Sequence, residues 1–97
     1  MLTSKQRAYL RARANPIDTV LMVGKGDIDE PLLRTADEAI TARELIKGKV
    51  LESSAYSARR AADIIAESIG AQVVQVIGRK FVLYRRNIDE PVIRLPR

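Results

Sequence analysis

Residues 20–29 read VLMVGKGDID, and the prediction of the fold starts from this stretch. Its first four residues form a short apolar run that is typical of a buried strand. The run ends at Gly24-Lys25-Gly26-Asp27, and a helical pattern follows from about Ile28. A glycine-bearing turn between a strand and a helix exposes backbone N–H groups beside a helix N-terminus, which suits a phosphate. An ordinary tight connection would also use glycine for its backbone angles, so the turn alone leaves both readings open.

Capping signals predict three helices. Thr3, followed by Gln6 three residues later, is typical of a capping box, and this helix should end near Ala14 because Pro16 disfavours helical angles just before it. Asp29 is expected to cap a second helix. The third should begin at one of several serines and end at a glycine, the residues concerned being Ser53, Ser54, Ser57 and Gly70.

The apolar residues of the later helices recur at helical spacing and predict the faces that they bury. In the second helix the expected stripe is Leu33, Ala36 and Ile40, flanked by Leu32 and Ala39. In the third helix it is Ala61, Ile64, Ile65, Ser68 and Ile69.

Three further strands are expected after the second helix. Residues 45–51 alternate, with Lys47 and Lys49 on the face opposite Ile46. These lysines could meet phosphates or simply lie on a half-solvated sheet. Residues 72–77 and 80–86 predict a hairpin closed by Gly78-Arg79. The order helix-strand-helix-strand-helix-strand-strand indicates one domain, residues 1–97, of the α/β class: an α+β two-layer sandwich with a four-stranded mixed sheet.

The charge of the chain is uneven. Its 97 residues carry 17 basic and 12 acidic side chains, a net charge of +5. Residues 1–14 and 79–86 each carry four basic side chains and no acid, whereas residues 27–44 carry six acids and two arginines. Two acid-free basic blocks indicate a polyanionic partner, although basic clusters are often only solvated surface.

Several classes of function are disfavoured by the residues that the chain lacks. It has no cysteine and no histidine, so the usual thiol nucleophile, zinc ligands and general base are missing. Asp27, Asp29 and Glu30 are close together without the spacing of a calcium loop, and helix capping explains them more simply. No apolar run is long enough to span a membrane. We therefore expect a cytoplasmic protein with no catalytic site, cofactor, metal or small-molecule substrate.

Several segments, in order along nearly the whole chain, resemble one family. They are 2–7 (LTSKQR), 15–16 (NP), 23–25 (VGK), 44–47 (ELIK), 75–79 (QVIGR), 82–85 (VLYR) and 95–97 (LPR). Together they are similar to the YhbY-like family, the bacterial stand-alone version of the CRM (chloroplast RNA splicing and ribosome maturation) domain.

The resemblance implies a fold like that of the C-terminal domain of translation initiation factor 3. It also implies binding of RNA, with ribosomal RNA in precursors of the large ribosomal subunit as the expected partner. A GxxG loop of this family approaches the RNA backbone, and the corresponding residues here are Gly24, Lys25, Gly26 and Asp27. Asp27 departs from that pattern, because the second glycine of the family stands at its position.

The expected RNA-binding surface adds basic residues to this loop: Arg7, Arg11, Lys47, Lys49, Arg79, Lys80 and Arg85. One alternative is a protein-binding adaptor whose basic faces dock an acidic partner, RNA contact being incidental. Another is a small hydrolase or transferase that uses the acids near Asp27. The sequence leaves the oligomeric state open.

Overall fold

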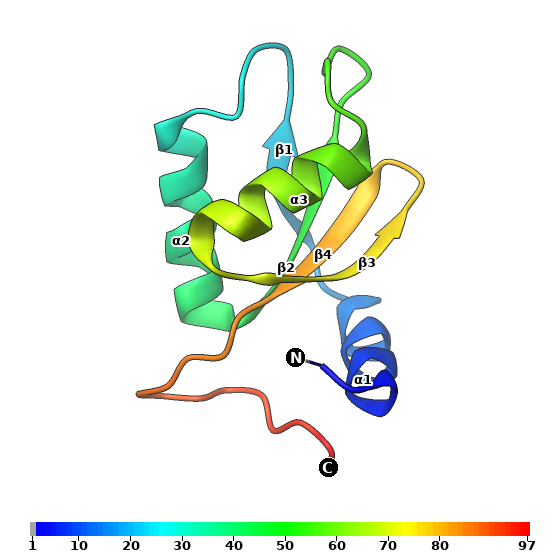
Figure 1. Ribbon diagram of the computed structural model, residues 1–97, viewed down its shortest axis with the longest axis vertical. Helices are drawn as coiled ribbons and strands as arrows, with labels where there is room; N and C mark the ends of the chain where they lie inside the picture. The colour runs from blue at the N-terminus through cyan, green and yellow to red at the C-terminus, as the bar shows by residue number, and fades with distance from the viewer. Residues whose placement is uncertain (1) are drawn as a thin grey trace.

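The structure is a computed structural model that describes residues 2–97. Within them the chain forms a four-stranded sheet and three helices (Figure 1). In order these are α1 (Ser4–Ala14), β1 (Thr19–Val23), α2 (Glu30–Arg43), β2 (Leu45–Val50), α3 (Ala58–Ile69), β3 (Gln72–Ile77) and β4 (Lys80–Tyr84). The predicted order of elements and the α+β class are confirmed.

The sheet is mixed, in the order β1-β2-β4-β3. β1 and β2 are parallel and joined through α2, whereas β4 pairs antiparallel with both β2 and β3. β1, β2 and β3 therefore run in one direction and end on one side of the sheet. The connections 24–29, 51–57 and 78–79 lie there together, and we call this side of the sheet the loop edge (Figure 1).

The helix caps are those that the sequence predicts. Thr3 and Gln6 form a reciprocal capping box, with N···O distances of 3.1 and 3.0 Å. Asp29 Oδ1 accepts from the N–H of Leu32 at 3.1 Å, and Ser57 caps α3. Gly70 ends α3 in the left-handed conformation. These local hydrogen bonds fix where each helix begins and ends.

The main core lies between one face of the sheet and the helices α2 and α3. Ala36 and Ile40 of α2 are buried there, as predicted. The stripe predicted for α3 is partly wrong, because Ser68 is exposed and Ile64 only half-buried. The buried residues of α3 are instead Ala58, Ala61, Ala62, Ile65 and Ala66. Small alanine side chains let the helix lie close to the sheet, and a prediction weighted towards large apolar residues misses them.

A smaller core lies on the opposite face of the sheet. Leu10 and Ala14 of α1 pack there against Leu45, Val74, Val82, Tyr84 and Ile93. The second face of the sheet, which the predicted two-layer sandwich leaves open, is therefore partly covered by α1 and the C-terminal segment. Towards the loop edge this face is open, and Met22 and Ile77 are 59% and 63% exposed.

Glu44 is the one buried charged residue within residues 2–97. Its carboxylate accepts three backbone N–H groups from the C-terminal segment: Asn87 at 2.7 Å, Val92 at 2.5 Å and Ile93 at 2.6 Å. Burial by itself raises the pKa of this carboxyl. The three hydrogen bonds and the charge of Arg86 outweigh burial, so the pKa lies below its ordinary value of 4.5.

We expect Glu44→Gln to destabilise the protein by about 2 kcal/mol at neutral pH, because an amide NH2 would face at least one of these N–H donors. The folded state binds the Glu44 proton less tightly than the unfolded chain does. The contribution of the carboxylate is therefore complete above the ordinary pKa and is lost as the pH falls through the lowered value. The difference in unfolding free energy between wild type and variant, measured by urea denaturation, should shrink from about pH 5 to about pH 3. A constant difference over that range would contradict this role.

Candidate nucleic-acid interface

The glycine loop, residues 24–27, lies at the loop edge between β1 and α2. The N–H of Leu51 donates to the carbonyl of Val23 at 2.9 Å and ties the start of the loop to the end of β2. Gly26 has φ +108°, whereas Asp27 does not have a positive φ. The backbone of this loop therefore needs its second glycine at position 26, and the departure at Asp27 causes no strain there.

The side chain of Asp27 is engaged with the neighbouring loop. The hydroxyl of Tyr56 donates to Asp27 Oδ1 at 3.1 Å, across the gap between 24–29 and 51–57. This hydrogen bond to a carboxylate, helped by burial, raises the pKa of Tyr56 because it favours the protonated phenol. The contact holds two of the three connections of the loop edge together.

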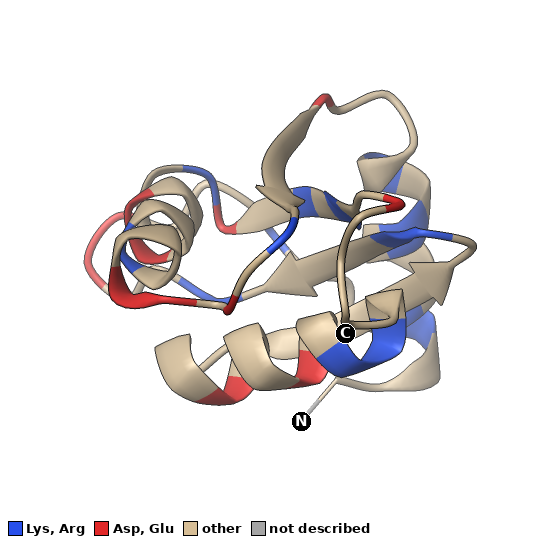
Figure 2. Ribbon diagram, turned by 90° about the horizontal axis from the view of Figure 1, so that it is seen from above, with Lys and Arg blue, Asp and Glu red and all other residues tan. Residues whose placement is uncertain are grey.

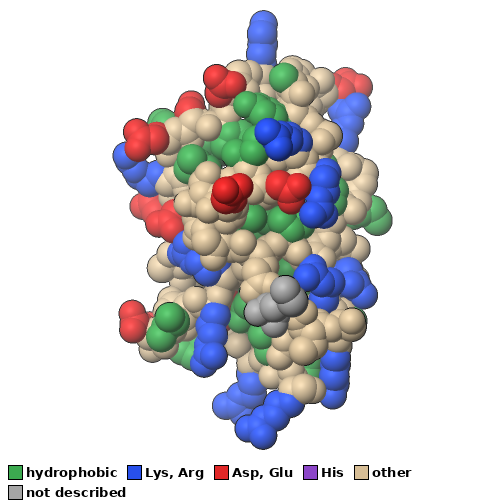
Figure 3. Space-filling view, viewed as in Figure 1, with side chains coloured by type: hydrophobic (Ala, Val, Ile, Leu, Met, Phe, Trp, Pro, Cys, Tyr) green, Lys and Arg blue, Asp and Glu red, His purple; other side chains and the backbone are tan. Residues whose placement is uncertain are grey.

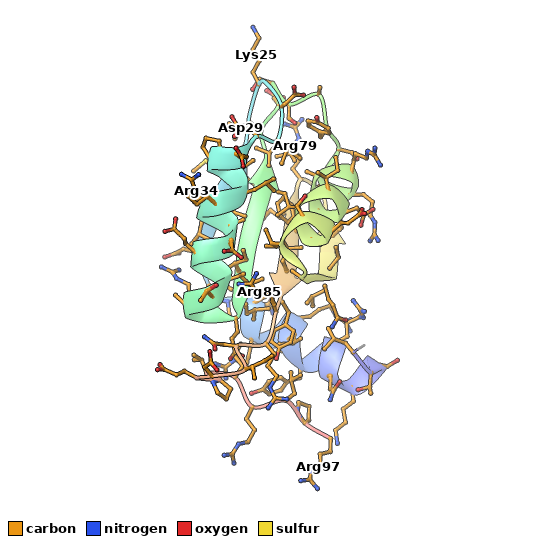
Figure 4. The ribbon with its side chains drawn as sticks, turned by 60° about the vertical axis from the view of Figure 1, so that its left-hand side comes forward. Lys25, Asp29, Arg34, Arg79, Arg85 and Arg97 are labelled. Atoms are coloured by element: carbon orange, nitrogen blue, oxygen red, sulfur yellow. The ribbon has the colours of Figure 1, made fainter. Side chains whose placement is uncertain are left out.

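Four cations gather at the loop edge, and we call them the loop-edge cations: Lys25, Lys49, Arg79 and Lys80. Lys25 lies at the tip of the glycine loop, at one extreme of the molecule (Figure 4). Lys49 and Lys80 are cross-strand partners in β2 and β4. Together with Arg79 they line a shallow hollow beside Leu51 and Ile77.

Of these four cations only Arg79 forms a salt bridge with a described residue. Arg79 lies 3.5 Å from Glu52, but both side chains are largely exposed, and an exposed pair of this kind is weak. Six of the twelve acidic residues lie in residues 27–44, on and beside α2 (Figure 2). Asp27, Asp29 and Glu52 belong to the connections of the loop edge, so the four cations there outnumber three acids. The loop edge can therefore attract an anion, and the outer face of α2 repels one.

Two further predicted residues lie on the sheet face that carries α1. Lys47 is two residues from Lys49 on the same strand, and its Nζ donates to the carbonyl of Asn15 at 3.3 Å. Arg11 is half-buried on α1. Lys47 extends the basic surface of the loop edge away from the glycine loop, towards the end of α1.

Arg7 and Arg85 are tied into the fold. Arg7 Nη1 donates to the carbonyls of Val73 and Val74, at 2.6 and 3.2 Å, where β3 has an irregular register. Arg85 lies between α2 and α3, and its guanidinium donates to Asp37, Thr41 and Ile69. Their place in an RNA-binding surface stays a prediction, and the interface described here does not depend on them. Nothing in the sequence pattern separates these arginines from the exposed ones.

Three basic residues outside the predicted RNA-binding surface lie together at the other end of the molecule. Arg86, Arg94 and Arg97 line one hollow beside the C-terminal segment. This segment has no helix or strand, so periodicity gives no signal that its arginines lie together.

Within residues 2–97 no helix is long and apolar enough to cross a membrane. Because the sequence has no histidine or cysteine, Asp and Glu are its only side chains of the types that usually bind metals. Within residues 2–97 no three of these carboxylates are grouped so that they could hold a metal ion.

The sequence matches the family model described as the CRS1 / YhbY (CRM) domain over residues 2–85. The chain is 35% identical over 96 residues to a Bacillus subtilis protein named "Probable RNA-binding protein YqeI", covering 99% of this chain and all of that one. It is 33% identical over 96 residues to a Haemophilus influenzae protein named "RNA-binding protein", covering 99% and 96% of the two chains.

A solved structure has the same fold. The solution structure of the hypothetical protein SAV1595 from Staphylococcus aureus superposes with a TM-score of 0.78 at 36% sequence identity. The match covers 99% of this chain and all of that one.

The internal hydrogen bonds of Arg85 predict that Arg85→Ala lowers the free energy of unfolding by about 2–3 kcal/mol, because Asp37 and the last turn of α3 lose a charged partner. Lys25→Ala is the matched control, since Lys25 is exposed at a loop tip, and should change stability by less than about 0.5 kcal/mol. Urea denaturation of both variants measures the difference. Equal stabilities would show that Arg85 does not hold the fold.

Proposed function

This chain belongs to the CRS1/YhbY (CRM) domain family, and from that premise we propose that it is a non-catalytic RNA-binding protein of ribosome assembly. In this proposal it acts in the cytoplasm on ribosomal RNA in precursors of the large subunit. The observation that carries the proposal is the loop edge, where a glycine loop and four weakly paired cations face solvent together. The names of its relatives in Bacillus and Haemophilus support the RNA partner.

The loop-edge cations suit the phosphate backbone of RNA. The turn of the glycine loop brings main-chain N–H groups and Lys25 to the tip, where residues 25–27 are exposed. Lys49, Arg79 and Lys80 add positive charge from the sheet and its hairpin. Cations on strands and tight turns keep a fixed spacing, so they can match the spacing of phosphates at a lower entropic cost than cations on long loops.

Base stacking contributes little in this proposal. The chain has three tyrosines and one phenylalanine. Phe81 and Tyr84 are buried, and Tyr56 is bonded to Asp27. The half-buried ring of Tyr9 is covered by the guanidinium of Arg13. The protein therefore recognises the shape and the backbone of RNA more than its sequence. The ribosomal partner itself rests on the family resemblance.

We expect the triple variant Lys25→Ala/Arg79→Ala/Lys80→Ala to weaken binding to a transcribed fragment of large-subunit ribosomal RNA by at least roughly tenfold. The slope of log K against log salt should fall by about 2, because each lost phosphate contact accounts for about 0.7 on a single strand. Fluorescence anisotropy over a salt series measures both quantities. Arg34→Ala/Arg43→Ala, which removes two positive charges from the acidic helix α2, is the control and should have a much smaller effect. The loop edge is not the RNA site if the two variants bind alike.

The large-subunit partner has its own test. Tagged protein should sediment with large-subunit precursors on a sucrose gradient and leave them after ribonuclease treatment or in high salt. The triple variant should remain near the top of the gradient, and the α2 control should not. A protein that keeps its partner after ribonuclease treatment would instead be an adaptor for another protein.

A further inference from the structure

A second basic site lies at the end of the molecule opposite the loop edge. A hollow of about 560 Å³ opens there between the C-terminal segment 91–97, the end of β4 and Gln6 of α1. Figure 4 shows Arg97 and Lys25 at opposite ends of the long axis, which measures 39 Å. In the space-filling view, Lys and Arg side chains project around this lower end (Figure 3).

Three arginines line the hollow, and no acidic side chain does. Within residues 2–97 none of Arg86, Arg94 and Arg97 forms a salt bridge. Arg86 acts on the charge of Glu44, but the carboxylate of Glu44 is buried and already accepts three N–H groups. The guanidinium groups therefore keep donors that an incoming anion can use.

Tyr84 adds an unused polar group. Its side chain is 4% exposed and packs in the smaller core, yet it lines the hollow. Its hydroxyl makes no hydrogen bond to another described residue and is not enclosed as an unpaired buried atom. Burial and then the charge of Glu44 raise the pKa of Tyr84, so the phenol keeps its proton at neutral pH. A buried ring with a free hydroxyl among the residues that line a hollow is a positioned donor.

The walls of the hollow are held in place although they have no regular secondary structure. The N–H groups of Val92 and Ile93 are bound by Glu44, one residue before Arg94. Gln6 Nε2 donates to the carbonyl of Pro96 at 3.0 Å, one residue before Arg97. Both arginines therefore start from anchored backbone, which lowers the entropy lost when they bind a ligand.

We propose that this hollow binds phosphodiester groups of RNA, as a second backbone contact of the same RNA that the loop edge binds. The inference rests on the proposed function. Arg86, Arg94 and Arg97 supply fork-shaped donors that match phosphate oxygens, and the hydroxyl of Tyr84, which also lines the hollow, supplies a further donor.

The distance between the two basic sites favours RNA over a small anion or an acidic peptide. The sites lie at opposite ends of a 39 Å molecule, with the acidic helix α2 along one side. A single polyanion that joins them needs about 11 nucleotides at roughly 3.4 Å per nucleotide. A continuous phosphate backbone supplies that length with charge throughout.

The test uses the full chain and a 24-nucleotide single-stranded RNA, roughly twice the length required. Arg94→Ala/Arg97→Ala should weaken binding about tenfold and reduce the salt slope by about 1.4, which corresponds to two phosphate contacts. Tyr84→Phe keeps the charge and the packing, and should weaken binding about threefold with an unchanged salt slope. Arg34→Ala/Arg43→Ala changes the net charge equally and should have less than about a twofold effect. Thermal unfolding of each variant checks that the fold is retained.

The outcomes separate this inference from the proposed function. If Arg94→Ala/Arg97→Ala and Tyr84→Phe bind like the control while the loop-edge variant binds weakly, the hollow is not an RNA contact and the proposed function stands. An acidic protein as the true occupant would give that same result. If wild type does not bind this RNA or ribosomal RNA, both the inference and the proposed function fail.

Discussion

Glu44 joins three parts of the fold through its backbone and its carboxylate. Its N–H donates to Ile40 and closes α2, its carbonyl accepts from Arg85 beside β4, and its side chain holds the C-terminal segment. It does so at φ +64°, an angle that costs a residue with a side chain about 1–2 kcal/mol. Glycine would avoid that cost, but three N–H groups, one of them buried and two part-buried, would lose their acceptor. Their hydrogen bonds to a charged group outweigh the strain.

The two basic sites are built by different means. The loop edge follows from topology, because parallel strands β1 and β2 end on one side and the β3–β4 turn joins them there. The hollow lined by Arg86, Arg94 and Arg97, here called the far hollow, depends on the C-terminal segment. This segment has no helix or strand, and Glu44 and Gln6 anchor it. Loss of the Glu44 carboxylate should therefore disturb the far hollow and leave the loop edge in place.

The sequence predicted those features of the fold that depend on residues close together in the chain, such as the helix caps. Thr3 with Gln6, Asp29 and Gly70 each act within one turn, so the caps at these positions were predicted correctly. The start of α3 was left open among three serines, of which Ser57 is the cap. The partners of Arg7, Arg85 and Glu44 lie 16 to 67 positions away, and no spacing rule reveals them. Gly48 is similar: a Cβ there would lie 2.6 Å from Cε1 of Phe81, a close approach that only the paired strands show. Local sequence patterns therefore predict the helices and strands. Which cations are bound within the fold, and which can contact a ligand, depends on long-range contacts that these patterns do not show.

The departure at Asp27 changes how the loop edge can act in the proposed complex. A phosphate roughly 7 Å from Asp27 in water is repelled by about 0.6 kcal/mol, and Lys25 at a similar distance attracts it by the same amount. The two side chains nearly cancel, so the glycine loop has almost no net charge to offer. The loop then contributes its backbone N–H groups. Gly26 allows the turn of the loop through its positive φ, and the hydrogen bond from Tyr56 to Asp27 holds the loop in place. The attraction must come from Lys49, Arg79 and Lys80, which places the electrostatic centre of the interface on the sheet rather than on the loop.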